Sequence, residues 1–125
     1  GIDFMESTAH LDQMIFISNG DKGISVGENS NIYVKNSKFE KNKYGIASKD
    51  LSKAIIETSE FEDNEIQLST YKKNWRYGDS GFIEIKKSNF TALNNKIVSD
   101  ENGEINIISS NFEGKIFKKG NVNIN

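Results

Sequence analysis

The sequence of 125 residues contains no cysteine and no proline, and it has a single tryptophan, a single histidine and a single arginine. Without cysteine, the chain forms no disulfide, no thiolate metal site and no thiol nucleophile. Proline inside a strand removes a ladder hydrogen bond, so its absence leaves every segment free to pair in a sheet. These absences favour a β-rich chain without covalent cross-links.

Charge of one sign and long apolar runs are also missing. Sixteen Lys and Arg residues stand against eighteen Asp and Glu residues, which gives a net charge of −2. A nucleic-acid-binding surface would need a concentrated excess of positive charge. The longest apolar run, at residues 14–17, is far shorter than the roughly 20 residues that span a bilayer. The sequence therefore predicts neither nucleic-acid binding nor membrane insertion.

Asparagine is abundant, with sixteen copies, and phenylalanine is regularly spaced. Asparagine tolerates the left-handed backbone conformation, which suits a chain that turns often. Four phenylalanines each follow a serine by two positions, at intervals of 22, 29 and 22 residues: Phe39, Phe61, Phe90 and Phe112. Self-similarity at a period of 20 to 50 residues indicates a repeat architecture.

Other positions repeat in register with these phenylalanines. Before each serine stand two apolar residues in an i, i+2 pattern, such as Ile32 and Val34, which predicts a short strand with one buried face. A less regular first copy matches at an offset of 23 over residues 9–19 and at an offset of 22 over residues 23–25. Alternating apolar residues also follow each phenylalanine and predict a second strand. In the later copies we expect Ile97, and then the pair Ile116 and Phe117, to take this place.

The repeat is too short for helix-containing units and lacks the leucine-rich pattern. We therefore predict an all-β fold, a right-handed parallel β-helix solenoid of about five coils of about 22 residues, with the phenylalanines stacked inside. Residues 1–125 form a single domain in this interpretation. Because a solenoid exposes sheet edges at its ends, we expect the chain to be a fragment with open ends, covered by flanking domains or by a second copy.

The coil pattern Ile-x-Val-x-x-Ser-x-Phe-x-x-Asn-x-x-Gly-Ile, clearest at residues 32–46, resembles the right-handed β-helix repeats of the pectin-lyase-like superfamily over nearly the entire chain. Residues 20–28, 45–50 and 71–73 are similar to a β-helical region of CotH-type bacterial surface proteins. The superfamily includes pectate lyases, polysaccharide hydrolases, epimerases, phage tailspikes and non-catalytic adhesins. The resemblance therefore implies the fold without choosing an activity.

An inserted loop at residues 69–80 interrupts the repeat and holds seven residues more than a coil needs. Insertions in repeat proteins often map to the binding face. Aromatic rings beside polar donors are suited to stacking on sugar rings, which makes the loop a candidate glycan contact. The alternative is that its aromatic residues fold back over the solenoid. The candidate ligand-binding residues here are Tyr71, Lys72, Trp75, Arg76 and Tyr77.

Register also aligns charged residues on the surface. Glu28, Asp50 and Lys72 form one column, and Asp21, Lys22 and Lys49 are expected nearby, which predicts a charged ligand pocket. The alternative is ordinary decoration of turns.

A second aligned pair consists of Glu40 and Glu62. Two carboxylates one strand spacing apart would suit Ca²⁺ or the roughly 5 Å pair of a retaining glycosidase. Lys38 and Lys41 stand among them, so we expect a solvated, lysine-compensated edge and predict no metal site.

Catalytic residues are not indicated within these coils. The sole arginine lies in the insertion, the outward strand positions lack an aspartate cluster, and His10 has no Ser or Asp partner in repeat register. We predict no cofactor. The leading hypothesis is a non-catalytic module of a bacterial secreted or cell-surface protein, acting outside the cell as a rigid spacer or a polysaccharide-binding platform. The alternatives are a fragment of a carbohydrate-active enzyme (a lyase, hydrolase or epimerase) and an assembly module that joins through its open ends.

Overall fold

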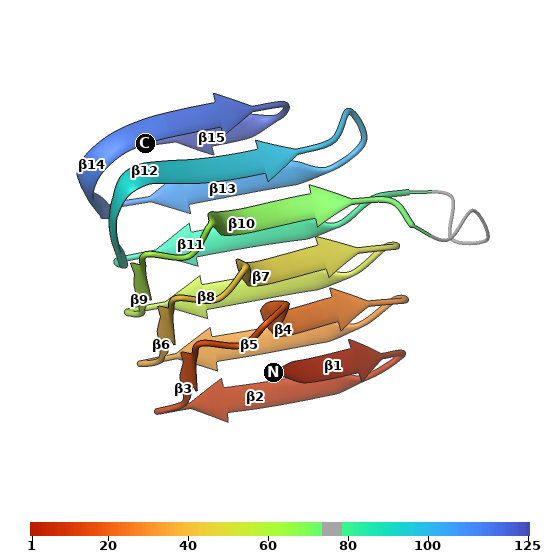
Figure 1. The fold of residues 1–125 in the computed structure, drawn as a ribbon. Helices are drawn as coiled ribbons and strands as arrows, with labels where there is room; N and C mark the ends of the chain where they lie inside the picture. The colour runs from red at the N-terminus through yellow and green to blue at the C-terminus, as the bar shows by residue number, and fades with distance from the viewer. Residues whose placement is uncertain (74–78) are drawn as a thin grey trace.

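The computed structural model describes residues 1–73 and 79–125 and shows β-coils stacked along one axis, with the two termini at opposite ends (Figure 1). The described part of the chain is built from strands and turns. The strands are β1 (Ile2–Met5), β2 (Thr8–Asp12), β3 (Ile15–Ile17), β4 (Lys22–Gly27), β5 (Asn31–Lys35), β6 (Lys38–Glu40), β7 (Tyr44–Lys49), β8 (Lys53–Glu57), β9 (Glu60–Glu62), β10 (Ile66–Tyr71), β11 (Phe82–Lys86), β12 (Asn89–Ser99), β13 (Glu104–Ile108), β14 (Asn111–Lys119) and β15 (Val122–Ile124).

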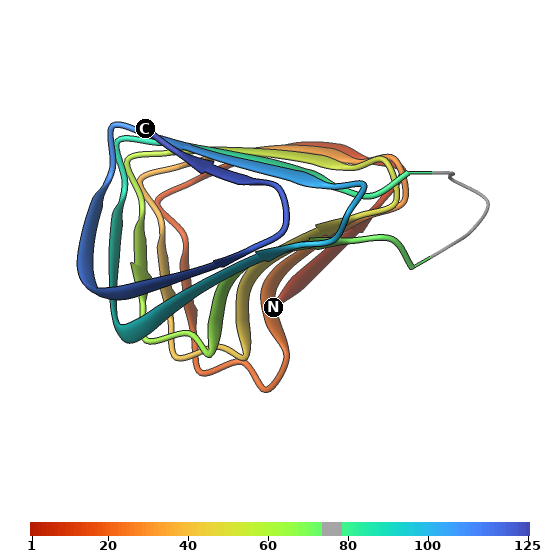
Figure 2. The same cartoon turned by 90° about the horizontal axis from the view of Figure 1, so that it is seen from above.

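Two parallel sheets run along the solenoid. Sheet B holds β2, β5, β8, β11, β13 and β15 in this order, and sheet A holds β1, β4, β7, β10, β12 and β14. The short strands β3, β6 and β9 pair with one another in this order, and β9 pairs with the first residues of β12. Together they form a third side of the solenoid, which we call the short side. The coils therefore have a roughly triangular outline along the axis (Figure 2). The predicted all-β solenoid is confirmed.

The phenylalanines form one interior stack. Residues Phe16, Phe39, Phe61, Phe90 and Phe112 pair in register from coil to coil. Neighbouring ring centroids lie 4.7 to 5.1 Å apart with interplanar angles of 7 to 12°. This spacing is set by the distance between adjacent strands. The predicted stack is confirmed, and it extends back to the irregular first coil.

Apolar columns from the two sheets complete the core. Sheet B contributes two columns at the predicted i, i+2 positions, and sheet A contributes one between them and the phenylalanines. Their fully buried members include Ile32, Val34, Ile56, Ile83, Ile85, Ile105 and Ile107 from sheet B, and Ile24, Ile46, Leu68 and Ile97 from sheet A. No helix among the described residues is long and apolar enough to cross a membrane.

The register of the last coil differs from the sequence-based expectation. Ile97 pairs with Lys118, whereas Ile116 and Phe117 pair with the two residues before Ile97. The cause is a bulge between Thr91 and Asn94 of β12, which shortens the repeat by one residue in β14.

The inserted loop also begins later than expected. β10 continues to Tyr71, so the first three residues of the predicted 69–80 loop belong to a strand, where Ser69 and Thr70 are buried. The ladder resumes where Leu51 donates its backbone N–H to the Ser80 carbonyl at 2.9 Å.

Candidate functional site

The corner between sheet B and the short side has the same backbone geometry in each coil. One residue adopts a left-handed conformation, with φ between 49 and 54°, and an inward-pointing serine or its equivalent follows. These residues are Gln13, Asn36, Thr58, Lys87 and Ser109. Asparagine adopts this conformation readily, but a β-branched threonine does so at a cost of roughly 1–2 kcal/mol. Strain of this kind often marks functional positions.

A ladder of serine hydroxyls fixes this corner. The Ser37 hydroxyl donates to the Lys35 carbonyl at 2.8 Å and accepts the backbone N–H of Met14 at 3.1 Å. Ser59 and Ser88 repeat the pattern in the next coils, again with 3.1 Å acceptor contacts. Each buried hydroxyl therefore has both a donor and an acceptor partner, which holds adjacent corners in one rigid line.

A surface groove follows this line across four coils, and we call it the axial groove. It has a volume of about 420 Å³, within the range of about 300–1,000 Å³ that is common for ligand sites. Its lining residues are Gln13, Met14, Ile15, Asn36, Ser37, Lys38, Thr58, Ser59, Glu60, Lys87 and Asn89. The register Ile15, Lys38, Glu60 and Asn89 shows that the groove runs parallel to the solenoid axis.

Some polar side chains of the axial groove have partners and others do not. Lys38 bonds to glutamates outside the groove, and Asn36 donates to Asp12 at 3.0 Å. The side chains of four lining residues make no hydrogen bond or ion pair with any other described residue: Gln13, Thr58, Glu60 and Lys87. The groove therefore offers an amide in the first coil, a hydroxyl and a carboxylate in the third and an ammonium group in the fourth, with neighbouring coils about 4.8 Å apart.

Four of the residues predicted as ligand contacts lie on the outer face of sheet A. They are Asp21, Lys22, Lys49 and Tyr71, which we call the sheet A cluster. Lys22 Nζ lies 2.9 Å from Asp21 Oδ2 and 5.3 Å from the centroid of the Tyr44 ring, which the sequence did not single out. Lys49 is paired with Tyr71 in register. Ser25, Ala47 and Ser69 point outward beneath these side chains and are buried.

The groups of this sheet A cluster interact with one another. Desolvation alone would lower the pKa of Lys22, but the hydrogen bond to Asp21 and the nearby Tyr71 and Tyr44 outweigh it and raise the pKa. The hydrogen bond from Lys22 lowers the pKa of Asp21. Burial raises the pKa of Tyr71, although the nearby Lys22 acts in the opposite direction. Because Asp21 and Lys22 already bond to each other, this cluster offers a ligand fewer free groups than the axial groove.

The remaining predicted residues lie at the corner where the insertion leaves the solenoid. Asp50 is 1% exposed, and its Oδ1 accepts the backbone N–H of Lys73 at 2.8 Å. Asp100, which follows β12 in the coil after that of Lys72, accepts the backbone N–H of Lys72 on its Oδ2 at 2.9 Å. Two carboxylates thus secure the base of the insertion. Glu28 follows the end of β4, whereas Asp21 and Lys22 stand at its start. The structure therefore divides the predicted charged pocket between two places.

Three predicted contact residues, Trp75, Arg76 and Tyr77, lie outside the described residues.

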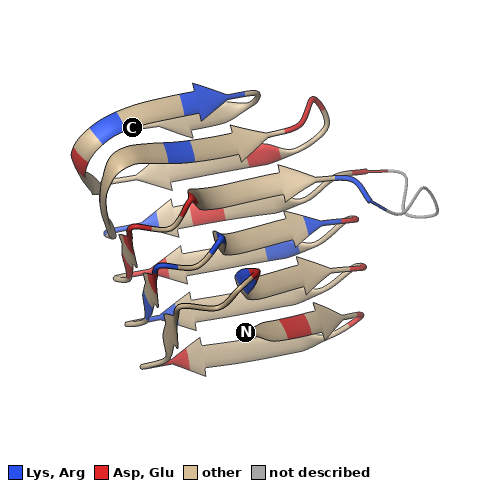
Figure 3. Cartoon of the chain, viewed as in Figure 1, with Lys and Arg blue, Asp and Glu red and all other residues tan. Residues whose placement is uncertain are grey.

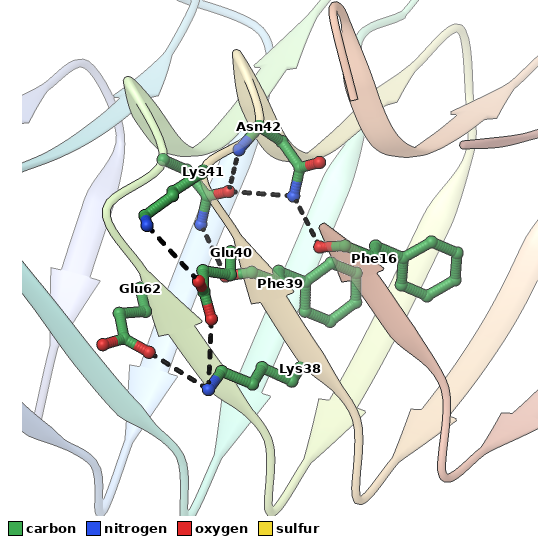
Figure 4. A network of polar contacts seen from close by, with 8 residues as sticks. Phe16, Lys38, Phe39, Glu40, Lys41, Asn42 and Glu62 are labelled. Carbon is green, nitrogen blue, oxygen red and sulfur yellow. Dashed lines mark hydrogen bonds and ion pairs between the residues drawn. The ribbon is translucent and has the colours of Figure 1, made fainter. Parts of the chain in front are cut away.

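The paired glutamates of the short side are neutralised as expected. Lys38 Nζ lies 3.2 Å from both Glu40 and Glu62, and Lys41 Nζ lies 3.8 Å from Glu40 (Figure 4). Acidic and basic positions therefore lie side by side along this edge (Figure 3). Within residues 1–73 and 79–125, no three His, Asp or Glu side chains are grouped to hold a metal ion. The expectation of a lysine-compensated edge is confirmed.

Sequence reasoning missed the axial groove. A signal was present, because the position just before the repeating serine is polar in Asn36, Thr58 and Lys87. The repeat indicated that these residues occupy one turn. It did not indicate that the turn is concave or which of its side chains lack partners.

Parallel strands, an in-register aromatic stack and serine ladders define this protein as a parallel β-solenoid. Residues 1–124 match the family described as "Right handed beta helix region", and the chain belongs to that family. No curated protein and no solved structure gives a significant match. The predicted right-handed β-helix is thereby confirmed, whereas the narrower resemblance to CotH-type proteins finds no support in these comparisons.

Proposed function

We propose that this chain is a non-catalytic β-helix module of a bacterial secreted or cell-surface protein, and that it binds polysaccharide along the axial groove. The observation that carries the proposal is the set of unpartnered polar side chains in that groove, Gln13, Thr58, Glu60 and Lys87. The serine ladder holds the backbone of this corner, so a ligand has to order only the side chains and not the backbone.

A linear polysaccharide fits the chemistry of this groove. Sugar hydroxyls both donate and accept hydrogen bonds, so they match amide, hydroxyl, carboxylate and ammonium groups alike. Met14 and the exposed Ile15 add apolar surface at the first coil, against which the faces of pyranose rings would pack. A chain of sugars lying along the axis would meet unpartnered polar groups in the first, third and fourth coils.

The test compares two double variants with the same change in composition. Glu60→Gln/Lys87→Ala removes two charged groups from the groove, and Glu113→Gln/Lys119→Ala does so on the exposed strand β14. Affinity electrophoresis against a panel of soluble neutral and acidic polysaccharides provides the measurement. We expect the groove variant to weaken binding by roughly 30-fold, because two hydrogen bonds contribute about 1 kcal/mol each. The β14 variant should bind like the wild type.

Other outcomes point to the alternative functions. Binding that survives the groove variant but is lost in Trp75→Ala would move the contact to the insertion. No binding to any polysaccharide would favour a rigid spacer. The appearance of new chain ends in the polysaccharide would identify a carbohydrate-active enzyme instead.

A further inference from the structure

The charged residues that line the axial groove differ in whether the protein itself compensates them. Lys38 is held by two ion pairs, with its Nζ 3.2 Å from a carboxylate oxygen of both Glu40 and Glu62. The other two charged lining residues, Glu60 and Lys87, are exposed and form no ion pair with any other described residue. The groove therefore presents one free carboxylate and one free ammonium group.

The charged residues that border the groove on sheet B have partners. Lys35 Nζ lies 4.0 Å from Glu57 Oε2, and Lys86 Nζ lies 3.8 Å from Glu84 Oε2. A ligand in the groove gains little from these residues, because each of them already has a group of opposite charge beside it. The free charges of Glu60 and Lys87 therefore distinguish the groove from the surface next to it.

Glu60 and Lys87 lie on either side of the serine ladder and in adjacent coils. Glu60 follows Ser59 in the third coil, and Lys87 precedes Ser88 in the fourth. Adjacent coils are about 4.8 Å apart along the axis. One sugar unit of an extended polysaccharide is about as long as this spacing. Two neighbouring sugars of a chain lying along the axis would therefore face opposite charges.

A polysaccharide with charges of only one sign fits this arrangement poorly. A polyanion would place a carboxylate beside Glu60, and a polycation would place an ammonium group beside Lys87. Like charges brought together oppose binding. A neutral chain avoids this repulsion, but it forms no hydrogen bond in which both groups are ionised, and charge-assisted bonds are the stronger ones. The arrangement favours a ligand that carries both signs.

We propose that the axial groove selects a zwitterionic polysaccharide, in which a sugar with a free amino group is next to a sugar with a carboxylate. The ammonium group of the ligand binds Glu60 in the third coil, and its carboxylate binds Lys87 in the fourth. Gln13 and Thr58 bind hydroxyl groups of the same chain. The inference names the substrate class of the groove and rests on the proposed polysaccharide binding.

The test uses four polysaccharides that share one backbone. Hyaluronan is the anionic form. Removal of its N-acetyl groups makes it zwitterionic, reduction of its carboxyl groups makes it neutral, and both treatments together make it cationic. Isothermal titration calorimetry gives the Kd of each form. We expect the zwitterionic form to bind about fivefold more tightly than each of the others, because an exposed ion pair contributes up to about 1 kcal/mol. The preference should disappear in roughly 1 M salt, where the Debye length is about 3 Å.

Single substitutions assign each charge of the ligand to its partner. Glu60→Gln should remove the preference for the zwitterionic over the anionic form, which differ in the amino group. Lys87→Gln should remove the preference over the cationic form, which lacks the carboxylate. The exchange Glu60→Lys/Lys87→Glu retains both signs and should still prefer the zwitterionic form.

Matched controls remove exposed charges from the same two coils outside the groove. Glu65→Gln and Lys96→Gln change residues that are exposed and do not line the groove, and both variants should bind like the wild type. Circular dichroism confirms that each variant retains its β-structure.

Several results would overturn the inference, and they differ from a failure of polysaccharide binding itself. Equal affinity of the wild type for all four forms would contradict selection by charge, as would binding to none of them. A preference that persists in both Glu60→Gln and Lys87→Gln, or that the control variants lose equally, would contradict the assigned partners. Failure of the proposed function would instead appear as the absence of groove-dependent binding across the panel of neutral and acidic polysaccharides.

Discussion

The first three coils and the last two turn the corner between the short side and sheet A in different ways. In the first three, a short strand (β3, β6 or β9) ends in a left-handed residue, and a separate strand of sheet A follows. In the last two, β12 and β14 run through the corner as single bent strands, which shortens the protrusion there (Figure 2).

Buried asparagines explain this difference. Asn42 Nδ2 donates to the Phe16 carbonyl at 3.0 Å, and its backbone N–H donates to Asn64 Oδ1 at 2.9 Å, so the turn in each coil is hydrogen-bonded to the next. The equivalent residue in the fourth coil is Leu93, which is 83% exposed. Without an amide to satisfy its backbone, that corner becomes a bulge. Gln67 Nε2 donates to Asn95 Oδ1 at 2.8 Å, and this bond extends the amide ladder to the fourth coil.

The largest expected effect is a loss of stability on removing a ring from the aromatic stack, and it should be greater in the middle of the stack than at its end. Phe61 is fully buried, with rings 4.8 Å away on both sides, whereas Phe112 contacts one ring and is partly exposed. Phe61→Ala should reduce the free energy of unfolding by about 3–5 kcal/mol, and Phe112→Ala by about half as much or less. Urea titration measures both values, with Phe61→Leu as a milder variant if the alanine protein does not fold. Equal losses would contradict the larger contribution expected of a fully buried ring with two ring neighbours.

The next effect tests the asparagine ladder directly. Asn64 accepts two hydrogen bonds from Asn42, at 2.9 and 3.0 Å, and donates to the Phe39 carbonyl and to Gln67. Asn64→Ala leaves these buried groups without partners and should lower the free energy of unfolding by about 2–3 kcal/mol.

The matched control for that change is Asn94→Ala in the bulge of β12, where the side chain is exposed and makes no hydrogen bond with the described residues. Its free energy of unfolding should change by less than about 0.5 kcal/mol. The amide ladder would not be the stabilising feature of the first three coils if both substitutions lowered the stability equally.

Much of the fold could be predicted from the sequence because apolar side chains with a period of two determine both the buried face and the register. Ile32 and Val34 need the same inward positions as Ile56 and Ile85, so the columns could be aligned before the structure was known. The β12 bulge could not be predicted, because it depends on the missing amide at Leu93 and on the space left opposite Gly114. A Cβ at Gly114 would meet the Ala92 carbonyl.

The candidate site was harder to predict for a different reason. Lys38 and Lys87 both line the axial groove, and no pattern in the sequence indicates which of them has an ion-pair partner. Only the spatial arrangement shows that Lys38 is held by two glutamates while Lys87 has no partner among the described residues. Polar side chains on a solenoid corner have several neighbours within reach, and small differences in position decide which of them bond.

The smallest expected effect concerns the outer face of sheet A in the first three coils, where Tyr71 and Lys22 cover β4, β7 and β10. Burial raises the pKa of Tyr71 above its usual 10.0, so the folded state holds the phenol proton more tightly than the unfolded state. The resulting stabilisation is complete below pH 10.0 and is lost as the pH rises through the higher pKa of the folded protein. The absorbance of tyrosinate in the wild type minus that in Tyr71→Phe isolates this group. Its midpoint should lie above that of the same chain unfolded in urea, and a midpoint at or below the unfolded value would show that Tyr71 is solvated rather than buried.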